Sequence, residues 1–232
     1  MLMIALRFLW VNDMGVNIQF LPKHKKNLVA TSSRMQKKDY FRAIALNYGF
    51  EYFDGSRDYG YGGYHYDGRW VAIAEKLISY YDLKPGDKVL DVGCAKGFLL
   101  YDLKLVCPGL EVYGLDISPY AVQHSHPALK GAIEVGNAHS LPFPDSSFDL
   151  VLSLNTLHNL ELEECRNALK EIQRVTISNA FVQVDSYRTD AELIAFERWM
   201  LTAKTYFDPQ GWLNFFAEAG YTGDYDWTIV EA

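Results

Sequence analysis

The chain has 232 residues, of which 49% are hydrophobic and 22% charged, so it is long enough to bury one α/β core without disulfides or metals. Its net charge of −7 argues against a nucleic-acid partner, because binding phosphates requires a basic face. The three cysteines, Cys94, Cys107 and Cys165, lack metal-ligand spacing, which favours a reducing, cytoplasmic location. The histidines show no metal-site pattern either, so we expect no bound metal.

Residues 1–69 are expected to form an N-terminal extension. Residues 1–11 are apolar, but the run is too short to span a bilayer and no cleavage site follows it, so we expect no membrane segment and no signal peptide. A packed strand or a wrongly assigned start site are the remaining interpretations. The rest of residues 1–40, with the basic cluster at 23–26, is typical of a loosely ordered, solvated segment.

Residues 40–69 form an arm that is rich in glycine and tyrosine, which favours a loop held by aromatic contacts. The aromatic side chains of residues 59–70 have two interpretations. They either fill a groove in a fixed arm or form a lid over a ligand pocket.

Residues 70–232 alternate between helical and strand patterns. Helices are predicted over residues 71–81, 97–106, 119–126, 162–175, 191–201 and 209–219, and strands over residues 88–92, 111–115, 132–135, 148–154, 180–185 and 225–230. This alternation predicts one α/β domain with a doubly wound, mainly parallel sheet and helices on both faces.

The most informative segment is 89–97, which reads Val-Leu-Asp-Val-Gly-Cys-Ala-Lys-Gly. It is an apolar strand that breaks into a glycine turn just before an apolar run. A strand, a tight turn and a helix start form a ligand site, because the turn brings backbone N–H groups close to the ligand. Asp91 precedes the first glycine, and its carboxylate would repel the pyrophosphate of NAD but suits a ligand with an ammonium group.

This segment resembles motif I of the class I S-adenosylmethionine (AdoMet) methyltransferases. The resemblance continues through Asp116, Asn137-Ala138 and the string Leu141–Asp149, so it covers residues 70–185 in order. It implies a Rossmann-like sheet of the seven-stranded type, AdoMet as cofactor, and a small-molecule acceptor, as in the branch called methyltransferase type 11.

The resemblance also implies where the cofactor lies. The residues that it places there are Asp91, Gly93, Cys94, Ala95 and Gly97 around the methionine part, Asp116 at the ribose, followed by Ile117, Asn137 and Ala138 at the adenine, Asn155 below the sulfonium, and Tyr64 from the arm. The family usually has glycine at position 95, and the alanine here is expected to have a negative φ. Lys96 is expected to point outward.

His158 is the candidate catalytic residue, because imidazole titrates near neutral pH and could take a proton from a hydroxyl or amine. The alternative is a histidine packed beside adenine or bonded to the backbone. Arg69 and Arg188 could hold an anionic group of the acceptor, or each could form a surface salt bridge.

Three functions follow from these patterns. The first is methyl transfer from AdoMet to oxygen or nitrogen of a small molecule such as a sugar. The second is an AdoMet-binding protein that uses the pocket for other chemistry or for regulation. The third is an NAD- or nucleotide-dependent enzyme, which the Asp91 turn disfavours. The sequence leaves the acceptor and the oligomeric state open.

Overall fold

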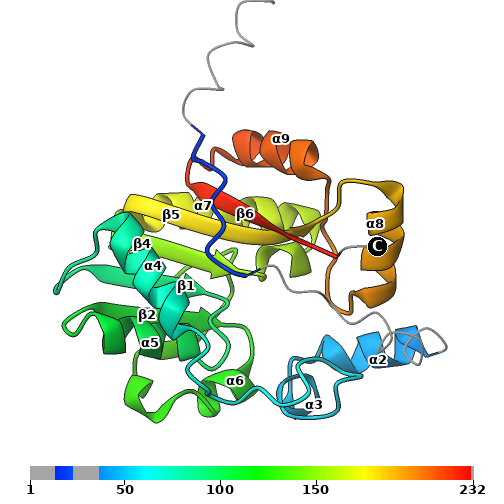
Figure 1. The fold of residues 1–232 in the computed structure, drawn as a ribbon, viewed down its shortest axis with the longest axis horizontal. Helices are drawn as coiled ribbons and strands as arrows, with labels where there is room; N and C mark the ends of the chain where they lie inside the picture. Colours follow the sequence, from blue (N-terminus) through cyan, green and yellow to red (C-terminus); the bar gives the residue numbers. More distant parts are fainter. Residues whose placement is uncertain (1–13, 23–36, 231–232) are drawn as a thin grey trace, which may run out of the picture.

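In a computed structural model, which describes residues 14–22 and 37–230, the chain folds around a sheet of six parallel strands (Figure 1). The strands lie in the order β3-β2-β1-β4-β5-β6, and every neighbouring pair is parallel. Their bounds are β1 Lys88–Val92, β2 Glu111–Asp116, β3 Ile133–Val135, β4 Phe148–Leu154, β5 Thr176–Ser186 and β6 Asp224–Ile229. The doubly wound prediction is confirmed, although the described residues contain six strands rather than the seven of the expected type.

Helices cover both faces of this sheet. The α-helices are α2 Lys38–Ala45, α3 Phe50–Phe53, α4 Val71–Tyr81, α5 Phe98–Val106, α6 Pro119–Gln123, α7 Leu162–Val175, α8 Asp190–Trp199 and α9 Pro209–Ala219, with 3₁₀ turns η3 Pro127–Leu129 and η4 Leu157–Asn159. Leu90 and Val92 pack with α7 and α9, whereas Val89 packs with α4 and α5, as alternate residues of a strand must. No helix of the described residues is long and apolar enough to cross a bilayer.

Two boundaries differ from the sequence prediction by more than two residues. Helix α6 begins as expected, since the Ser118 Oγ caps it by accepting from the Ala121 N–H at 2.9 Å. It ends at Gln123 rather than His126, and Pro127 disfavours a helical conformation at His126. Strand β5 starts at Thr176, directly after α7, and not at residue 180.

The N-terminal extension is more ordered than expected where it is described. The backbone of residues 16–18 pairs with β6, where the Ile18 N–H donates to the Tyr225 carbonyl at 2.9 Å. The Phe20 ring is 3% exposed and lies edge-on to Phe181, with ring centroids 4.9 Å apart. The expectations for residues 1–11 and for the basic cluster at 23–26 lie outside the described residues.

Residues 40–69 were expected to form a loop, but helix α2 extends into this range as far as Ala45, and Phe50–Phe53 form helix α3. Arg42 of α2 donates to the Ala203 carbonyl at 2.8 Å, so this helix is fixed to the segment after α8, beside which it lies in Figure 1. Residues 59–67 do form a loop.

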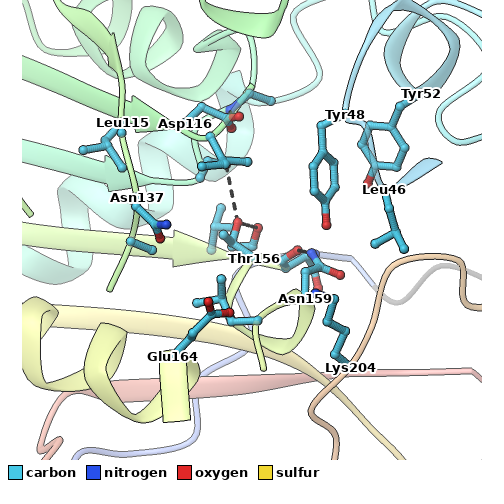
Figure 2. Close-up of a pocket in the computed structure, with 18 of the residues that line it drawn as sticks. Leu46, Tyr48, Tyr52, Leu115, Asp116, Asn137, Thr156, Asn159, Glu164 and Lys204 are labelled. Atoms are coloured by element: carbon cyan, nitrogen blue, oxygen red, sulfur yellow. Dashed lines mark hydrogen bonds between the residues drawn. The ribbon is translucent and has the colours of Figure 1, made fainter. Parts of the chain in front are cut away.

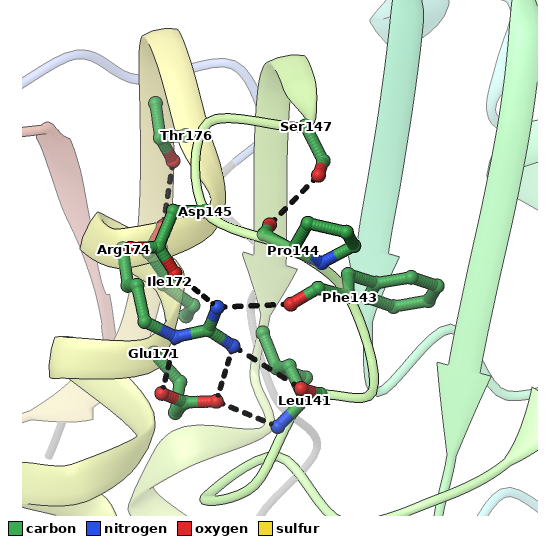
Figure 3. A network of polar contacts seen from close by, with 9 residues as sticks. All are labelled: Leu141, Phe143, Pro144, Asp145, Ser147, Glu171, Ile172, Arg174 and Thr176. Carbon is green, nitrogen blue, oxygen red and sulfur yellow. Dashed lines mark hydrogen bonds and ion pairs between the residues drawn. The ribbon is translucent and has the colours of Figure 1, made fainter.

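Arg174 of α7 holds the first part of the Leu141–Asp149 string in place before β4. Figure 3 shows the Arg174 guanidinium donating to the carbonyls of Leu141 (3.1 Å) and Phe143 (2.9 Å) and pairing with Asp145 at 2.7 Å. Glu171 pairs with the same guanidinium and also accepts from the Leu141 N–H at 2.8 Å. Arg174 therefore fixes the segment that joins β3 to β4.

Candidate functional site

A cavity of about 290 Å³ lies at the carboxyl ends of the central strands, where the strand order reverses between β1 and β4. It is the size of a small ligand site. Its lining comes from strand ends, from the arm and from the segment after α8: Leu46, Tyr48, Tyr52, Phe53, Tyr61, Gly93, Ala95, Leu115, Asp116, Ile117, Gly136, Asn137, Ala138, Leu154, Asn155, Thr156, Asn159, Leu160, Glu164 and Lys204. Figure 2 shows Asp116 and Asn137 on one side and Tyr48, Tyr52, Asn159 and Lys204 on the other.

The glycine turn after β1 requires its glycines. Gly93 has a φ of +85°, and a Cβ there would lie 2.1 Å from the Thr156 Oγ1. Gly97 has a φ of +75°, and a Cβ would lie 2.3 Å from the Ile133 side chain. The turn therefore packs closely against strand β3 and against the segment that follows β4. This packing sets the floor of the cavity.

Ala95 corrects a sequence expectation. Its φ is +51°, in the left-handed region, and not negative as predicted. This conformation costs an alanine roughly 1–2 kcal/mol. It directs the Ala95 N–H at the Asp116 Oδ2, 2.7 Å away, so the strained residue joins the turn to the end of β2.

Asp116 is fixed by two backbone donors. Besides the Ala95 N–H, the Ser118 N–H donates to its Oδ1 at 2.8 Å. Burial raises the pKa of the Asp116 carboxyl, and the two backbone hydrogen bonds oppose that shift. Each carboxylate oxygen retains a further lone pair, so the pair of oxygens can still accept from two ligand hydroxyls.

Asp91 is a buried carboxylate that forms no ion pair within the described part of the chain. It is 4% exposed, is not part of the cavity lining, and its Oδ1 has no hydrogen-bond partner among the described residues. Burial, and then the charge of Asp116, raise the pKa of Asp91 to about 7. An orphaned acceptor of this kind fits a ligand that brings a positive charge to the turn.

Asn137 and Ala138 line the cavity after β3, as expected, next to Ile117. The Asn137 Oδ1 accepts weakly from the His139 N–H at 3.4 Å, which leaves its NH₂ and a second lone pair for a ligand. Asn155 also lines the cavity, and its Oδ1 accepts from Thr228 Oγ1 at 2.7 Å.

Other candidates lie outside the lining. Cys94 and Gly97 belong to the turn but do not line the cavity. Tyr64 is buried behind Tyr61 and stacks on Phe98, with ring centroids 4.9 Å apart. Tyr61, rather than Tyr64, is the tyrosine of residues 59–67 that borders the cavity.

His158 is 4% exposed and is not part of the lining. Its Nδ1 accepts from the Asp185 N–H at 3.0 Å, and its Nε2 lies 3.2 Å from the Asp185 Oδ2. Both ring nitrogens therefore contact strand β5, which matches the backbone-bonded alternative, and a catalytic role for His158 stays a prediction.

The basic candidates are engaged elsewhere. Arg69 pairs with the exposed Asp67 at 2.7 Å, and Arg188 pairs with Glu192. Lys96, expected to point outward, is instead 4% exposed and pairs with Asp54. The described residues contain no group of three His, Cys, Asp or Glu side chains that could hold a metal.

Backbone strain concentrates at the cavity. Five non-glycine residues of the described chain have positive φ, and three of them line the cavity: Tyr48 (+46°), Ala95 (+51°) and Asn155 (+53°). Such conformations persist only where the surrounding structure enforces them, and they cluster at functional sites. The lining also includes Tyr48, Thr156, Asn159 and Lys204, none of which has a spacing in the sequence that by itself predicts a place in the cavity.

Part of the chain is similar to known methyltransferases. Residues 90–184 match the model of a family described as a methyltransferase domain. The demethylmenaquinone methyltransferase of Thermotoga maritima is 36% identical over 117 residues, which cover 48% of this chain and 50% of that protein. The malonyl-[acyl-carrier protein] O-methyltransferase of Erwinia billingiae is 33% identical over 121 residues, covering 50% of this chain and 45% of that protein.

The fold has solved counterparts as well. The YcgJ protein of Bacillus subtilis superposes with a TM-score of 0.52 at 21% identity, covering 63% of this chain and 66% of that one. This likeness concerns the fold alone. The chain spans about half the length of the curated relatives that it matches.

Proposed function

The chain belongs, over residues 90–184, to a methyltransferase-domain family, and on that premise we propose that it transfers a methyl group from AdoMet to oxygen or nitrogen of a small molecule. The observation that carries the proposal is the pair of buried carboxylates at the strand ends. Asp91 has no counterion among the residues that the structure describes, and Asp116 keeps free lone pairs, as a cofactor with an ammonium group and two ribose hydroxyls requires.

Different residues of the site would contact different parts of the cofactor. Asp116 would accept from the ribose hydroxyls, and Asn137 and Ala138 would border the adenine. The turn from Gly93 to Ala95 would hold the methionine part, with Asp91 balancing its ammonium charge. When bound, AdoMet supplies an electrophilic methyl: the carbon–sulfur bond breaks with its electrons left on sulfur, and the acceptor atom that gains the methyl releases a proton to water.

The chain's own residues would position the acceptor and exclude water from the cavity. A sulfonium methyl needs little further activation, so holding the acceptor in line with it can supply much of the rate. The arm tyrosines Tyr48, Tyr52 and Tyr61 border the cavity opposite the strand ends and would exclude water there. No protein base is required by this scheme.

Titration calorimetry with AdoMet, its demethylated product AdoHcy, and NAD tests the proposal. We expect AdoMet and AdoHcy to bind and NAD to bind weakly or not at all. A turnover screen over sugar, amino-acid and phenolic acceptors, followed by AdoHcy release, then identifies the acceptor. Binding of NAD in preference to AdoMet would contradict the proposal. Binding of AdoMet with no turnover on any acceptor class would favour the non-transfer alternative.

A further inference from the structure

The parts of the cavity follow the order of the strands whose ends border it. Under the proposed function, adenine lies after β3, ribose after β2 and methionine after β1. The next strand along the edge is β4, and the segment after it therefore borders the space beyond the reacting methyl. Asn159 comes from this segment, and Figure 2 shows it with Tyr48, Tyr52 and Lys204 on the side away from Asn137.

Asn159 presents an unused hydrogen-bond acceptor there. Its Oδ1 is buried and has no hydrogen-bond partner among the described residues. Its Nδ2 donates to the Asn155 carbonyl at 3.2 Å, and this contact fixes which end of the amide is which. A buried carbonyl oxygen without a donor is costly, so a ligand that brings a hydroxyl to it is favoured over one that does not.

Lys204 places a positive charge next to that acceptor. It is the one basic residue among the described residues that line the cavity, and in Figure 2 its side chain extends toward Asn159. Its Nζ pairs at 3.1 Å with Glu161, whose side chain is 67% exposed. An ion pair with so exposed a partner is weak, so an anionic ligand can compete for the ammonium group. The acidic Glu164 lies on the Asn137 side in Figure 2.

Tyr48 supplies a donor and a flat surface. Its hydroxyl points into the cavity in Figure 2 and makes no hydrogen bond within residues 14–22 and 37–230. Burial and the charge of Asp116 raise the pKa of Tyr48 to about 12, so its hydroxyl stays protonated and can donate. The left-handed backbone that aims this ring is held by the Ser118 Oγ, which donates to the Tyr48 carbonyl at 2.5 Å.

We propose that Asn159, Lys204 and Tyr48 form the acceptor subsite, and that this subsite selects a hydroxylated small molecule carrying a negative charge. The inference rests on the proposed function. The acceptor's hydroxyl donates to the Asn159 Oδ1, and its anionic oxygens accept from Lys204 and Tyr48. An acceptor with an ammonium group is disfavoured, because Lys204, a basic residue of the cavity lining, would repel it.

Binding to the AdoHcy-saturated protein tests the selection without requiring turnover. Calorimetry compares 4-hydroxybenzoate with its neutral methyl ester and with benzoate, and compares glucuronate with glucose. The two series separate a phenolic acid from a sugar acid as the source of this chemistry. In at least one series we expect the hydroxylated acid to bind about tenfold more tightly than its neutral counterpart, as one good charged contact would provide.

Variants assign the contacts. Lys204→Met should remove the preference for the acid over the neutral compound, whereas Lys170→Met, at an exposed lysine of α7, should leave it unchanged. Asn159→Leu should weaken 4-hydroxybenzoate but not benzoate, and Tyr48→Phe should weaken both acids. AdoHcy affinity measured in each variant shows that the cofactor part of the site is intact.

The outcomes are distinguishable. If AdoHcy itself does not bind, the proposed function fails and this inference fails with it. If AdoHcy binds but neutral compounds bind as well as the acids, or no compound of either series binds, the acceptor subsite is wrong and the proposed function stands.

Discussion

The Lys96 ammonium lies 2.6 and 2.7 Å from the two carboxylate oxygens of Asp54, with side chains only 6% and 13% exposed. Lys96 belongs to the glycine turn and Asp54 follows α3, so this buried pair joins the candidate cofactor site to the arm. Tyr120 also donates to Asp54, at 2.6 Å. Burial alone would raise the pKa of Asp54, but the hydrogen bonds from Lys96 and Tyr120 lower it overall.

Lys96→Met should lower the free energy of unfolding by about 3 kcal/mol, because it leaves the Asp54 carboxylate buried without its counterion. Chemical denaturation measures the change. Lys84→Met is the matched control, since Lys84 pairs with Asp82 at the surface, and it should cost less than about 1 kcal/mol. Equal, small losses in both variants would show that the arm is not held by this pair.

Limited proteolysis tests whether residues 59–67 are a lid or a fixed arm. The loop carries Arg57 and Arg69 at its ends, and Tyr66 fastens it to the buried Asp102 through a 2.6 Å hydrogen bond. If the loop is a lid, trypsin should cut after these arginines in the free protein and more slowly when AdoHcy is bound. Cutting after Lys130, at the amino-terminal end of β3, should not change. Equal cutting in both states would favour the fixed arm.

Much of the fold was accessible from the sequence, because strand and helix patterns alternate clearly after residue 70 and buried parallel strands read as apolar runs. The arm was harder. Helix α2 lies in a segment whose glycines and tyrosines suggested a loop, and it is held by Arg42, whose partner Ala203 lies far along the chain. Local patterns carry no information about such contacts.

The site residues likewise fall into those that the sequence pattern could predict and those that it could not. The residues at strand ends, such as Asp116 and Asn137, could be placed from their position in the pattern. Asn159 and Lys204 could not, because they meet only through the packing of the segments after β4 and α8. Two predictions were wrong: Lys96 was expected to be exposed, and Ala95 was expected to have a negative φ. The burial of Lys96 depends on Asp54 and the positive φ of Ala95 on Asp116, and both partners are distant in sequence.

Asp116→Ala should weaken AdoMet binding by about 2–3 kcal/mol, because two ribose hydrogen bonds to a charged acceptor are lost in a buried site. Calorimetry measures the loss. Since the same substitution also removes the contacts to Ala95 and Ser118, thermal unfolding of the variant must be compared with the parent. An unchanged affinity would remove Asp116 from the cofactor site.

Gly93→Ala and Gly131→Ala separate backbone strain from crowding. The two glycines have nearly the same φ, +85° and +84°, but a Cβ at Gly131 meets nothing within 4 Å, whereas one at Gly93 meets Thr156. Gly131→Ala should cost roughly 1–2 kcal/mol of unfolding free energy. Gly93→Ala should cost roughly 1–3 kcal/mol more and also weaken AdoMet. Equal costs would mean that Thr156 yields freely, and Gly93→Ala Thr156→Ser should recover part of any difference.

AdoMet binding should release a proton near pH 6, and Asp91 should be its source. In the free protein the pKa of Asp91 is about 7, raised by burial and then by Asp116, so the carboxyl is largely protonated at pH 6. An ammonium group placed beside it favours the ionised form, so binding expels the proton. At pH 8 the carboxyl is already largely ionised, and binding should release far less than at pH 6.

The sign of the pH dependence follows from this linkage. Affinity for AdoMet should increase as the pH rises from 5 to 7, by up to about tenfold per unit, and then level off. The stability of the free protein should change in the opposite direction. Between an unfolded pKa of about 4 and the folded pKa, the folded state binds more protons, so its stability falls as the pH rises.

Calorimetry at pH 6 in two buffers of different ionisation enthalpy counts the released protons. Asp91→Asn serves as the control, because it keeps the shape of the side chain but cannot ionise. It should abolish the release and flatten the affinity profile, although it loses the charge that holds the ammonium and therefore binds more weakly at pH 8. Proton release that persists unchanged in Asp91→Asn would assign the titration to another group, and Asp91 would then have no part in binding the cofactor's charge.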